Sequence, residues 1–338
     1  MSHLIPLLVA FSLAAGASAQ KDDPDLRAGD WGKVDRSQAI ATAMRILQAN
    51  ADVCGKTAAL KQLREGGGRF SNLDRGKRPV TGIWLEIPPG ADFMFDVTDG
   101  HLFAASVDEG NWLQSVANPI SAAQCREAAE HFIQVAGVRA DSFVVSYEEP
   151  VLTPDVADAY VHIWPVYQGV KSSVEFGATI SRADGGLVSL SLGPTYDYDT
   201  LGNVQWLPED RCLAVALDAY HRYKPFADTE VGSCEKLVGH PWMGEMIASE
   251  FTQGQRSYLS RRIALPFYQF RFYDAGRTHP GPRTFGEAQI VSVDASTGKA
   301  MTILIPGGGL GGQATTPVML RAALDASPKL EVVGGGRT

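Results

Sequence analysis

Apolar residues recur at helical spacing in three segments of the chain. The first segment covers 37–47 behind a candidate N-cap at Asp35 or Ser37, the second begins at Ser121, and the third begins at Pro208. Spacing of i, i+3, i+4 and i+7 predicts an amphipathic helix in each. The apolar stripes are Ile40, Ala43, Met44 and Leu47 in the first, Cys125, Ala128, Ala129 and Phe132 in the second, and Cys212, Val215, Ala216 and Ala219 in the third.

Strand-like alternation of apolar and polar residues follows the helical segments. We expect half-buried antiparallel strands at 142–147, 159–164 and 265–273. Three further stretches read as strand, glycine-containing turn, strand, and predict β-hairpins at 93–103, 178–190 and 290–303.

Helix and hairpin recur three times in the same order. From helix start to turn glycine the chain runs 63, 65 and 90 residues, measured from Ser37 to Gly100, Ser121 to Gly186 and Pro208 to Gly298. The third unit therefore carries about 25 extra residues, which we place in an insertion at 224–256. Such a repeat indicates duplication of one supersecondary unit.

Helices followed by antiparallel strands, repeated along the chain, predict the α+β fold class in tandem units. The expected divisions are a signal peptide at 1–19, a divergent first unit at 20–115, a second unit at 116–205, a third unit at 206–306, and a Gly-rich linker and tail at 307–338.

Two motifs resemble the PepSY-like families, including the YcdB/YcdC-type repeats of exported bacterial proteins. Residues 160–170 are similar to the strand–loop–strand of those repeats, and residues 291–299, with Asp294 and Gly298, are similar to the end of a PepSY unit. The resemblance covers 119–305, and reaches 35–110 only through the repeat. It implies a helix packed across an antiparallel sheet.

The resemblance also bears on function. Related domains occur in protease propeptides, which inhibit or chaperone the enzyme, and in exported proteins of unknown role. No catalytic residues come with it. Because no peptidase follows Ile305 in this sequence, we expect any regulated peptidase to be another molecule.

The N-terminal residues read as a secretory signal. An apolar run from Leu4 to Leu13 precedes Ala17-Ser18-Ala19, which fits a cleavage site near Ala19. A buried N-terminal strand or helix is the alternative. No later apolar run is long enough to span a membrane. We expect a secreted or periplasmic protein.

Four cysteines, Cys54, Cys125, Cys212 and Cys234, allow three fully paired connectivities. In an oxidising compartment we expect disulfides, and the most local arrangement pairs Cys212 with Cys234 and leaves Cys54 with Cys125. Their spacing disfavours a zinc site, so no metal is predicted.

Charge and composition restrict the partner. With 38 acidic and 30 basic residues the net charge is -8, and no basic run is present, so nucleic acid is not an expected partner. A content of 45% apolar and 20% charged residues is typical of a globular chain and excludes disorder, collagen and coiled coil.

The sequence holds no familiar catalytic or cofactor motif. H-E-x-x-H, G-x-S-x-G and phosphate-binding glycine loops are absent, so neither catalytic residues nor a cofactor are predicted. His162, beside Tyr160 and near Glu148 and Glu149, is the most interesting polar cluster. An aromatic-rich, half-exposed strand explains it more simply than proton transfer.

Aromatic residues next to loop-forming residues are the better candidates for binding a partner. They are Trp164, Tyr167, Tyr196, Tyr198 and Trp242. Packing between repeats is the alternative for each of them. Asp197 and Asp199, together with Glu148 and Glu149, suggest an acidic rim.

These observations predict an exported, non-enzymatic module that binds a protein or peptide, with regulation or inhibition of a secreted peptidase suggested by the family resemblance. Two alternatives stay open: an exported hydrolase whose site lies between repeats, and a structural or interaction protein of the cell envelope.

Overall fold

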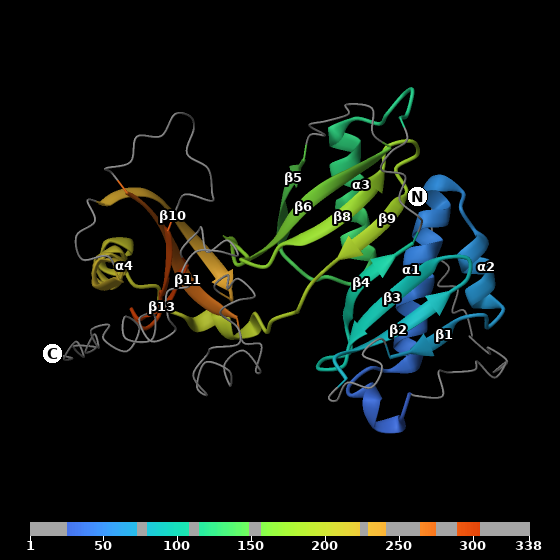
Figure 1. Ribbon diagram of the computed structural model, residues 1–338, viewed down its shortest axis with the longest axis horizontal. Coiled ribbons are helices and arrows are strands. Elements are labelled where there is room, and N and C mark those ends of the chain that lie inside the picture. The colour runs from blue at the N-terminus through green and yellow to red at the C-terminus, as the bar shows by residue number, and fades with distance from the viewer. Residues whose placement is uncertain are drawn as a thin grey trace, which may run out of the picture.

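The computed structural model describes residues 26–72, 80–107, 115–148, 157–223, 229–240, 264–274 and 289–304. The predicted α+β class is confirmed, because helices pack on antiparallel sheets (Figure 1). The predicted signal peptide at 1–19, the linker and tail at 307–338 and Trp242 lie outside these residues. In the described part, no helix is both long and apolar enough to cross a membrane.

The three predicted helices form, and local capping sets where two of them begin. Asp35 accepts a hydrogen bond from the Gln38 N–H at 2.9 Å, and Ser121 and Gln124 form a reciprocal capping box. The helices are α1 (Arg36–Cys54), α2 (Ala58–Arg64), α3 (Ala122–Val135) and α4 (Glu209–Tyr223), with 3-10 turns η1 (Ala28–Trp31) and η2 (Asp199–Asn203).

The larger sheet has nine strands in the order β1-β2-β3-β4-β9-β8-β6-β5, with β7 paired to β6. Two antiparallel meanders meet through their last strands, β4 and β9, so helices α1 and α3 cover the same face (Figure 1). The strands are β1 (Arg69–Ser71), β2 (Gly82–Ile87), β3 (Ala91–Asp96), β4 (Leu102–Ser106), β5 (Ser142–Tyr147), β6 (Asp158–Tyr167), β7 (Val170–Lys171), β8 (Phe176–Ser181) and β9 (Leu187–Ser191).

The smaller sheet is a four-stranded antiparallel meander that packs against α4. Its strands are β10 (Thr229–Gly239), β11 (Leu265–Asp274), β12 (Gln289–Asp294) and β13 (Ala300–Leu304). Residues 229–239, which the sequence analysis assigns to an insertion, form the first strand of this meander. The predicted insertion at 224–256 therefore starts too early in the sequence, because residues 229–239 belong to the sheet. The boundaries of the three units stay a prediction.

The three predicted hairpins share one turn geometry. The N–H groups of Gly100, Gly185 and Gly298 donate to the carbonyl four residues earlier, each at 2.8 Å, and all three glycines have positive φ. A register shift occurs at the equivalent place in each hairpin. The turn glycine of the middle hairpin is thus Gly185 rather than Gly186, and the shared geometry supports duplication.

One continuous core joins α1, α2 and α3 to the nine-stranded sheet, and a second core lies between α4 and the smaller sheet. A parallel bridge between Ser172 and Val238 links the two sheets, supported by the Ser173 N–H bond to the Val238 carbonyl at 2.8 Å. Lys171 adds an ion pair to Glu235 at 3.4 Å.

The predicted disulfides are absent, because all four cysteines are free thiols. The Cys54 thiol donates to the carbonyl of Asn50 one helical turn earlier, at 3.0 Å. Cys125 is buried in the larger core, whereas Cys212 and Cys234 belong to the smaller one. No disulfide joins these four cysteines, and the Cys234 thiol has a hydrogen bond with Glu209.

Candidate peptide-binding pocket

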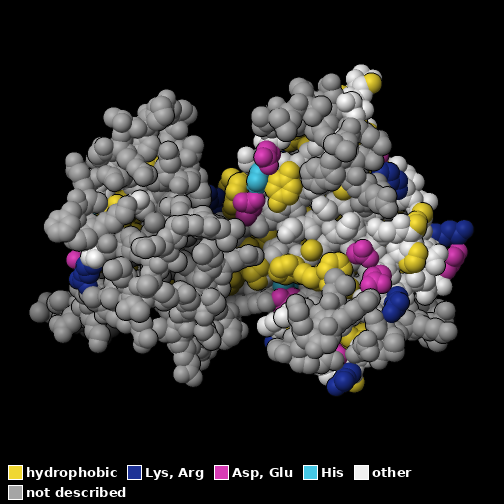
Figure 2. Space-filling view, in the orientation of Figure 1, with side chains coloured by type: hydrophobic (Ala, Val, Ile, Leu, Met, Phe, Trp, Pro, Cys, Tyr) yellow, Lys and Arg dark blue, Asp and Glu magenta, His cyan; other side chains and the backbone are white. Residues whose placement is uncertain are grey.

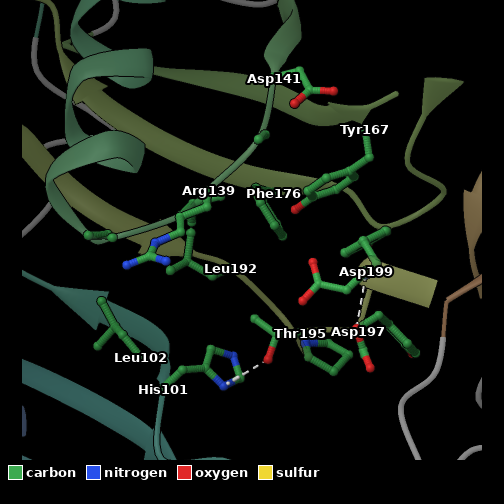
Figure 3. A pocket seen from close by; sticks show the side chains of 17 residues that line it. His101, Leu102, Arg139, Asp141, Tyr167, Phe176, Leu192, Thr195, Asp197 and Asp199 are labelled. Atoms are coloured by element: carbon green, nitrogen blue, oxygen red, sulfur yellow. Dashed lines mark hydrogen bonds between the residues drawn. The ribbon is translucent and has the colours of Figure 1, made fainter. Parts of the chain in front are cut away.

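A cavity of about 570 Å³ opens beside the end of the nine-stranded sheet, and we call it the tyrosine pocket (Figure 3). It is lined by the start of β4, the loop 136–141 after α3, the end of β6, Phe176, and the connector 192–199 that leads to η2. Its volume lies within the range of ligand-binding cavities, roughly 300–1,000 Å³.

Tyr167, Tyr196 and Tyr198 give the pocket its aromatic wall. The rings of Tyr167 and Tyr198 stack with centroids 3.6 Å apart, and the hydroxyls of Tyr198 and Ser172 are hydrogen-bonded at 2.9 Å. Burial, together with the nearby Asp141 carboxylate, raises the pKa of Tyr167 to about 12. A tyrosine can contact a ligand through the face of its ring and through its hydroxyl.

Charged groups of both signs reach the same cavity. Arg139 directs its guanidinium into it between Leu102 and Leu192 (Figure 3), and in the described structure it has no hydrogen bond or ion pair. Asp141 accepts from the Gln168 N–H at 2.6 Å, which fixes the loop. Asp199 also extends its carboxylate toward the cavity (Figure 3).

His101 lies at the floor of the pocket and is held on both ring nitrogens. Its Nδ1 is bonded to Asp99 and its Nε2 lies 3.2 Å from the Gly193 carbonyl oxygen. The Thr195 hydroxyl donates to Asp99 at 2.7 Å and is 3.2 Å from the same Nδ1. These contacts fasten the connector to the β3–β4 turn.

This histidine cluster lacks the arrangement of a hydrolase. In a nucleophile–histidine–acid triad, the acid and the hydroxyl bond opposite ring nitrogens. Here Asp99 and Thr195 share Nδ1, and a carbonyl occupies Nε2. Both ring nitrogens thus already have partners within the fold.

Three of the five predicted binding residues come together in this pocket, namely Tyr167, Tyr196 and Tyr198. Trp164 lies elsewhere, on the face of β6 that α3 does not cover, and stacks on His162 with centroids 5.9 Å apart. Trp242 lies outside the described residues.

The polar cluster around His162 does form. Its Nδ1 lies 2.5 Å from Glu175 and its Nε2 lies 3.3 Å from Glu148, while Tyr160 meets the ring edge-on. Figure 2 shows a histidine between acidic and hydrophobic side chains on this face. Two carboxylates hold the ring in place, which fits the simpler explanation of a half-exposed aromatic strand.

Sequence reasoning missed Arg139, Asp141 and His101 as pocket residues. Arg139 and Asp141 follow the positive-φ Gly137 that ends α3. A helix-ending glycine followed by charged residues was the available signal, since such a turn aims the next residues away from the helix. Nothing local links them to tyrosines that lie further along the chain.

No protein-family model and no curated protein matches the chain. The structure is similar to the Bacillus megaterium YpeB C-terminal domain, with a TM-score of 0.38 and 10% sequence identity, over 82% of this chain and 99% of that chain. A likeness of this size assigns neither family nor function, so membership of the PepSY-like families stays a prediction.

Proposed function

We propose that this protein is an exported binding protein for peptide segments, and that it regulates a secreted peptidase by holding such a segment. The observation that carries the proposal is the meeting of three tyrosines with Arg139 in one cavity. Export, with cleavage near Ala19, comes from the N-terminal sequence pattern, and the peptidase partner is what the resemblance to the PepSY-like families implies.

The chemistry of the pocket suits a peptide. Tyrosine faces and hydroxyls contact side chains and peptide groups alike, at low cost in conformational entropy. The free guanidinium of Arg139 bonds carbonyl or carboxylate oxygens. Asp199 offers an acceptor for peptide N–H groups or a basic side chain. A pocket with both charges favours a ligand that also carries both.

Binding can be tested with a pool of random heptapeptides passed over the immobilised protein. Retained peptides are identified by mass spectrometry and their affinities measured by calorimetry. Arg139→Gln and Tyr196→Ala should each weaken binding at least tenfold. Arg126→Gln, an exposed arginine on α3, is the matched control and should leave affinity within twofold. A wild-type protein that retains no peptide would contradict the proposal.

The peptidase role needs its own measurement. Secreted serine and metallo-peptidases from the host organism are assayed with and without the purified protein. We expect at least one to be inhibited, with Arg139→Gln relieving the inhibition. If the whole panel is unaffected, peptidase regulation is wrong, and peptide binding stands or falls on calorimetry alone.

A further inference from the structure

Strand β5 forms one edge of the nine-stranded sheet. Among the described strands it pairs only with β6, and the register between them runs from Ser142 opposite Val166 to Tyr147 opposite Val161 without a shift. The opposite edge, β1, has three residues. β5 is therefore the longer of the two edges along which another strand could pair.

The sequence of β5, Ser-Phe-Val-Val-Ser-Tyr, carries none of the features that protect edge strands. Natural edges are blunted by lysine, proline, bulges or inward charges, because unpaired backbone groups recruit other chains. β5 has no charge, no proline and no bulge, and Val144 is 44% exposed. An edge that favours strand pairing this strongly is typical of a surface that receives a strand.

The ladder identifies which backbone groups face outward. The Glu148 N–H donates to the Tyr160 carbonyl at 3.1 Å, so residue 148 bonds β6. Because ladder bonds alternate along an antiparallel pair, Val144 and Ser146 also bond β6, whereas Phe143 and Val145 point their N–H and C=O groups away from it. An added strand would bond these outward groups.

The direction of an added strand decides what reaches the tyrosine pocket. β5 begins at Ser142, directly after Asp141, which lines the pocket. An antiparallel strand on this edge ends beside Ser142, so its C-terminal residue arrives next to the cavity. There the unpaired guanidinium of Arg139 matches a terminal carboxylate.

We infer that the peptide ligand adds to β5 as an antiparallel strand and places its C-terminal residue, with a free carboxylate, in the tyrosine pocket. The inference rests on the proposed peptide-binding function and specifies how the peptide is held. Side chains of the added strand that lie on the exposed face contact Val144 and, beyond it, Trp164, its register partner on β6. This assigns Trp164 a binding role outside the pocket.

The test uses the tightest heptapeptide from the random pool in four forms: the free acid, the C-terminal amide, and two forms N-methylated at the odd-numbered or at the even-numbered residues. The free acid should bind at least tenfold more tightly than the amide, and Arg139→Gln should remove that difference. N-methylation should weaken binding at least tenfold in one of the two alternating sets, because it removes donors to the edge. Equal binding of acid and amide would overturn the predicted direction.

Two variants of β5 test whether its outward backbone groups bind the peptide. Val145→Pro removes an outward N–H while keeping every bond to β6, and proline is tolerated on edge strands. It should weaken binding at least tenfold. Val145→Ala keeps the N–H and should bind within twofold of wild type, and thermal melting confirms that both fold.

The outcomes separate the inference from the function on which it rests. Binding that survives both Val145→Pro and N-methylation but is lost in Arg139→Gln overturns strand addition and leaves peptide binding in the pocket. If Val145→Pro does not fold, the N-methylated peptides decide the question on wild-type protein. Absence of any retained peptide contradicts the proposed function itself.

Discussion

The side chain of Asn50 on α1 accepts a hydrogen bond from the backbone N–H of Leu187 on β9, at 2.7 Å and 137 residues away along the chain. Asn50 is 2% exposed. The bond ties the first helix to the last strand of the second meander. β9 is also the strand through which the two meanders meet, because it pairs with β4.

Replacement of this asparagine should destabilise the whole larger sheet. Asn50→Ala leaves the buried Leu187 N–H without its acceptor, which costs about 1–3 kcal/mol in free energy of unfolding. Urea unfolding monitored by fluorescence measures the change. Gln38→Ala, on the exposed face of the same helix, should change stability by less than about 0.5 kcal/mol. Equal effects of the two variants would show that the bond contributes nothing.

Local sequence signals were sufficient to predict α1, α3, α4 and the three hairpins, whereas α2 was not predicted. Asp35 and Ser121 cap helices where the pattern placed them, and Gly100 and Gly298 occupy their turns. Capping and tight turns depend on a few neighbouring residues, so one sequence is enough to recognise them. The α+β class followed from these elements.

Contacts between segments far apart in the chain could not be predicted from local sequence signals. Nothing near β4 or β9 specifies that these strands pair, because the pairing joins segments about 85 residues apart. β10 escaped notice since Glu230, Gly232 and Glu235 interrupt its alternation. Only some of the pocket residues were predicted. Aromatic residues beside loop-forming residues can be recognised in the sequence, whereas Arg139 lines the pocket only because of the fold.

Gly100 and Gly185 allow a matched test of backbone conformation against steric contact. The two glycines lie in equivalent turns, with φ angles of 80° and 79°. A Cβ on Gly100 would lie 2.4 Å from the Lys33 carbonyl oxygen, whereas one on Gly185 would meet only Val53 and Ile120 side chains at 3.6 and 3.7 Å.

Alanine at the two positions should therefore have unequal effects. Gly185→Ala should cost about 1–2 kcal/mol of stability, from the left-handed backbone alone. Gly100→Ala should cost more, because a backbone carbonyl must also shift. Chemical unfolding of both variants gives the comparison, and a Gly185 variant as unstable as the Gly100 variant would contradict the predicted contact.

The Cys234 thiol should react slowly with thiol reagents, although its side chain is only half-buried. Burial, followed by the charge and hydrogen bond of Glu209, raises the pKa of Cys234 to about 12. Since the thiolate is the reactive form, its reaction with a thiol reagent at pH 8 should be about 10³-fold slower than that of a thiol with pKa near 9. Mass spectrometry of the labelled peptides follows each cysteine separately.

The cause of this shift can be checked with one substitution. Glu209→Gln removes the neighbouring charge, so labelling of Cys234 at pH 8 should become several-fold faster. Glu230→Gln, on the same strand as Cys234, is the control and should leave the rate unchanged. Faster labelling in both variants would point to general loosening of the smaller sheet.

The Asp99–His101 contact makes stability depend on acid pH. Burial alone would raise the pKa of Asp99, but hydrogen bonds from His101 and Thr195 and the charge of His101 lower it well below its ordinary value. A carboxyl whose pKa is lower in the folded state stabilises the fold above its unfolded pKa, about 3.9, and loses that contribution as pH falls toward the folded value.

Asp99→Asn should therefore be less stable than wild type at pH 7, on the order of 1–2 kcal/mol after allowing for partial exposure. The difference should shrink below about pH 4, because there the carboxyl of the unfolded chain takes up a proton while that of the folded protein stays ionised. Asp52→Asn, which replaces an exposed carboxyl on α1, is the control, and a pH-independent difference for Asp99→Asn would refute the assigned contact.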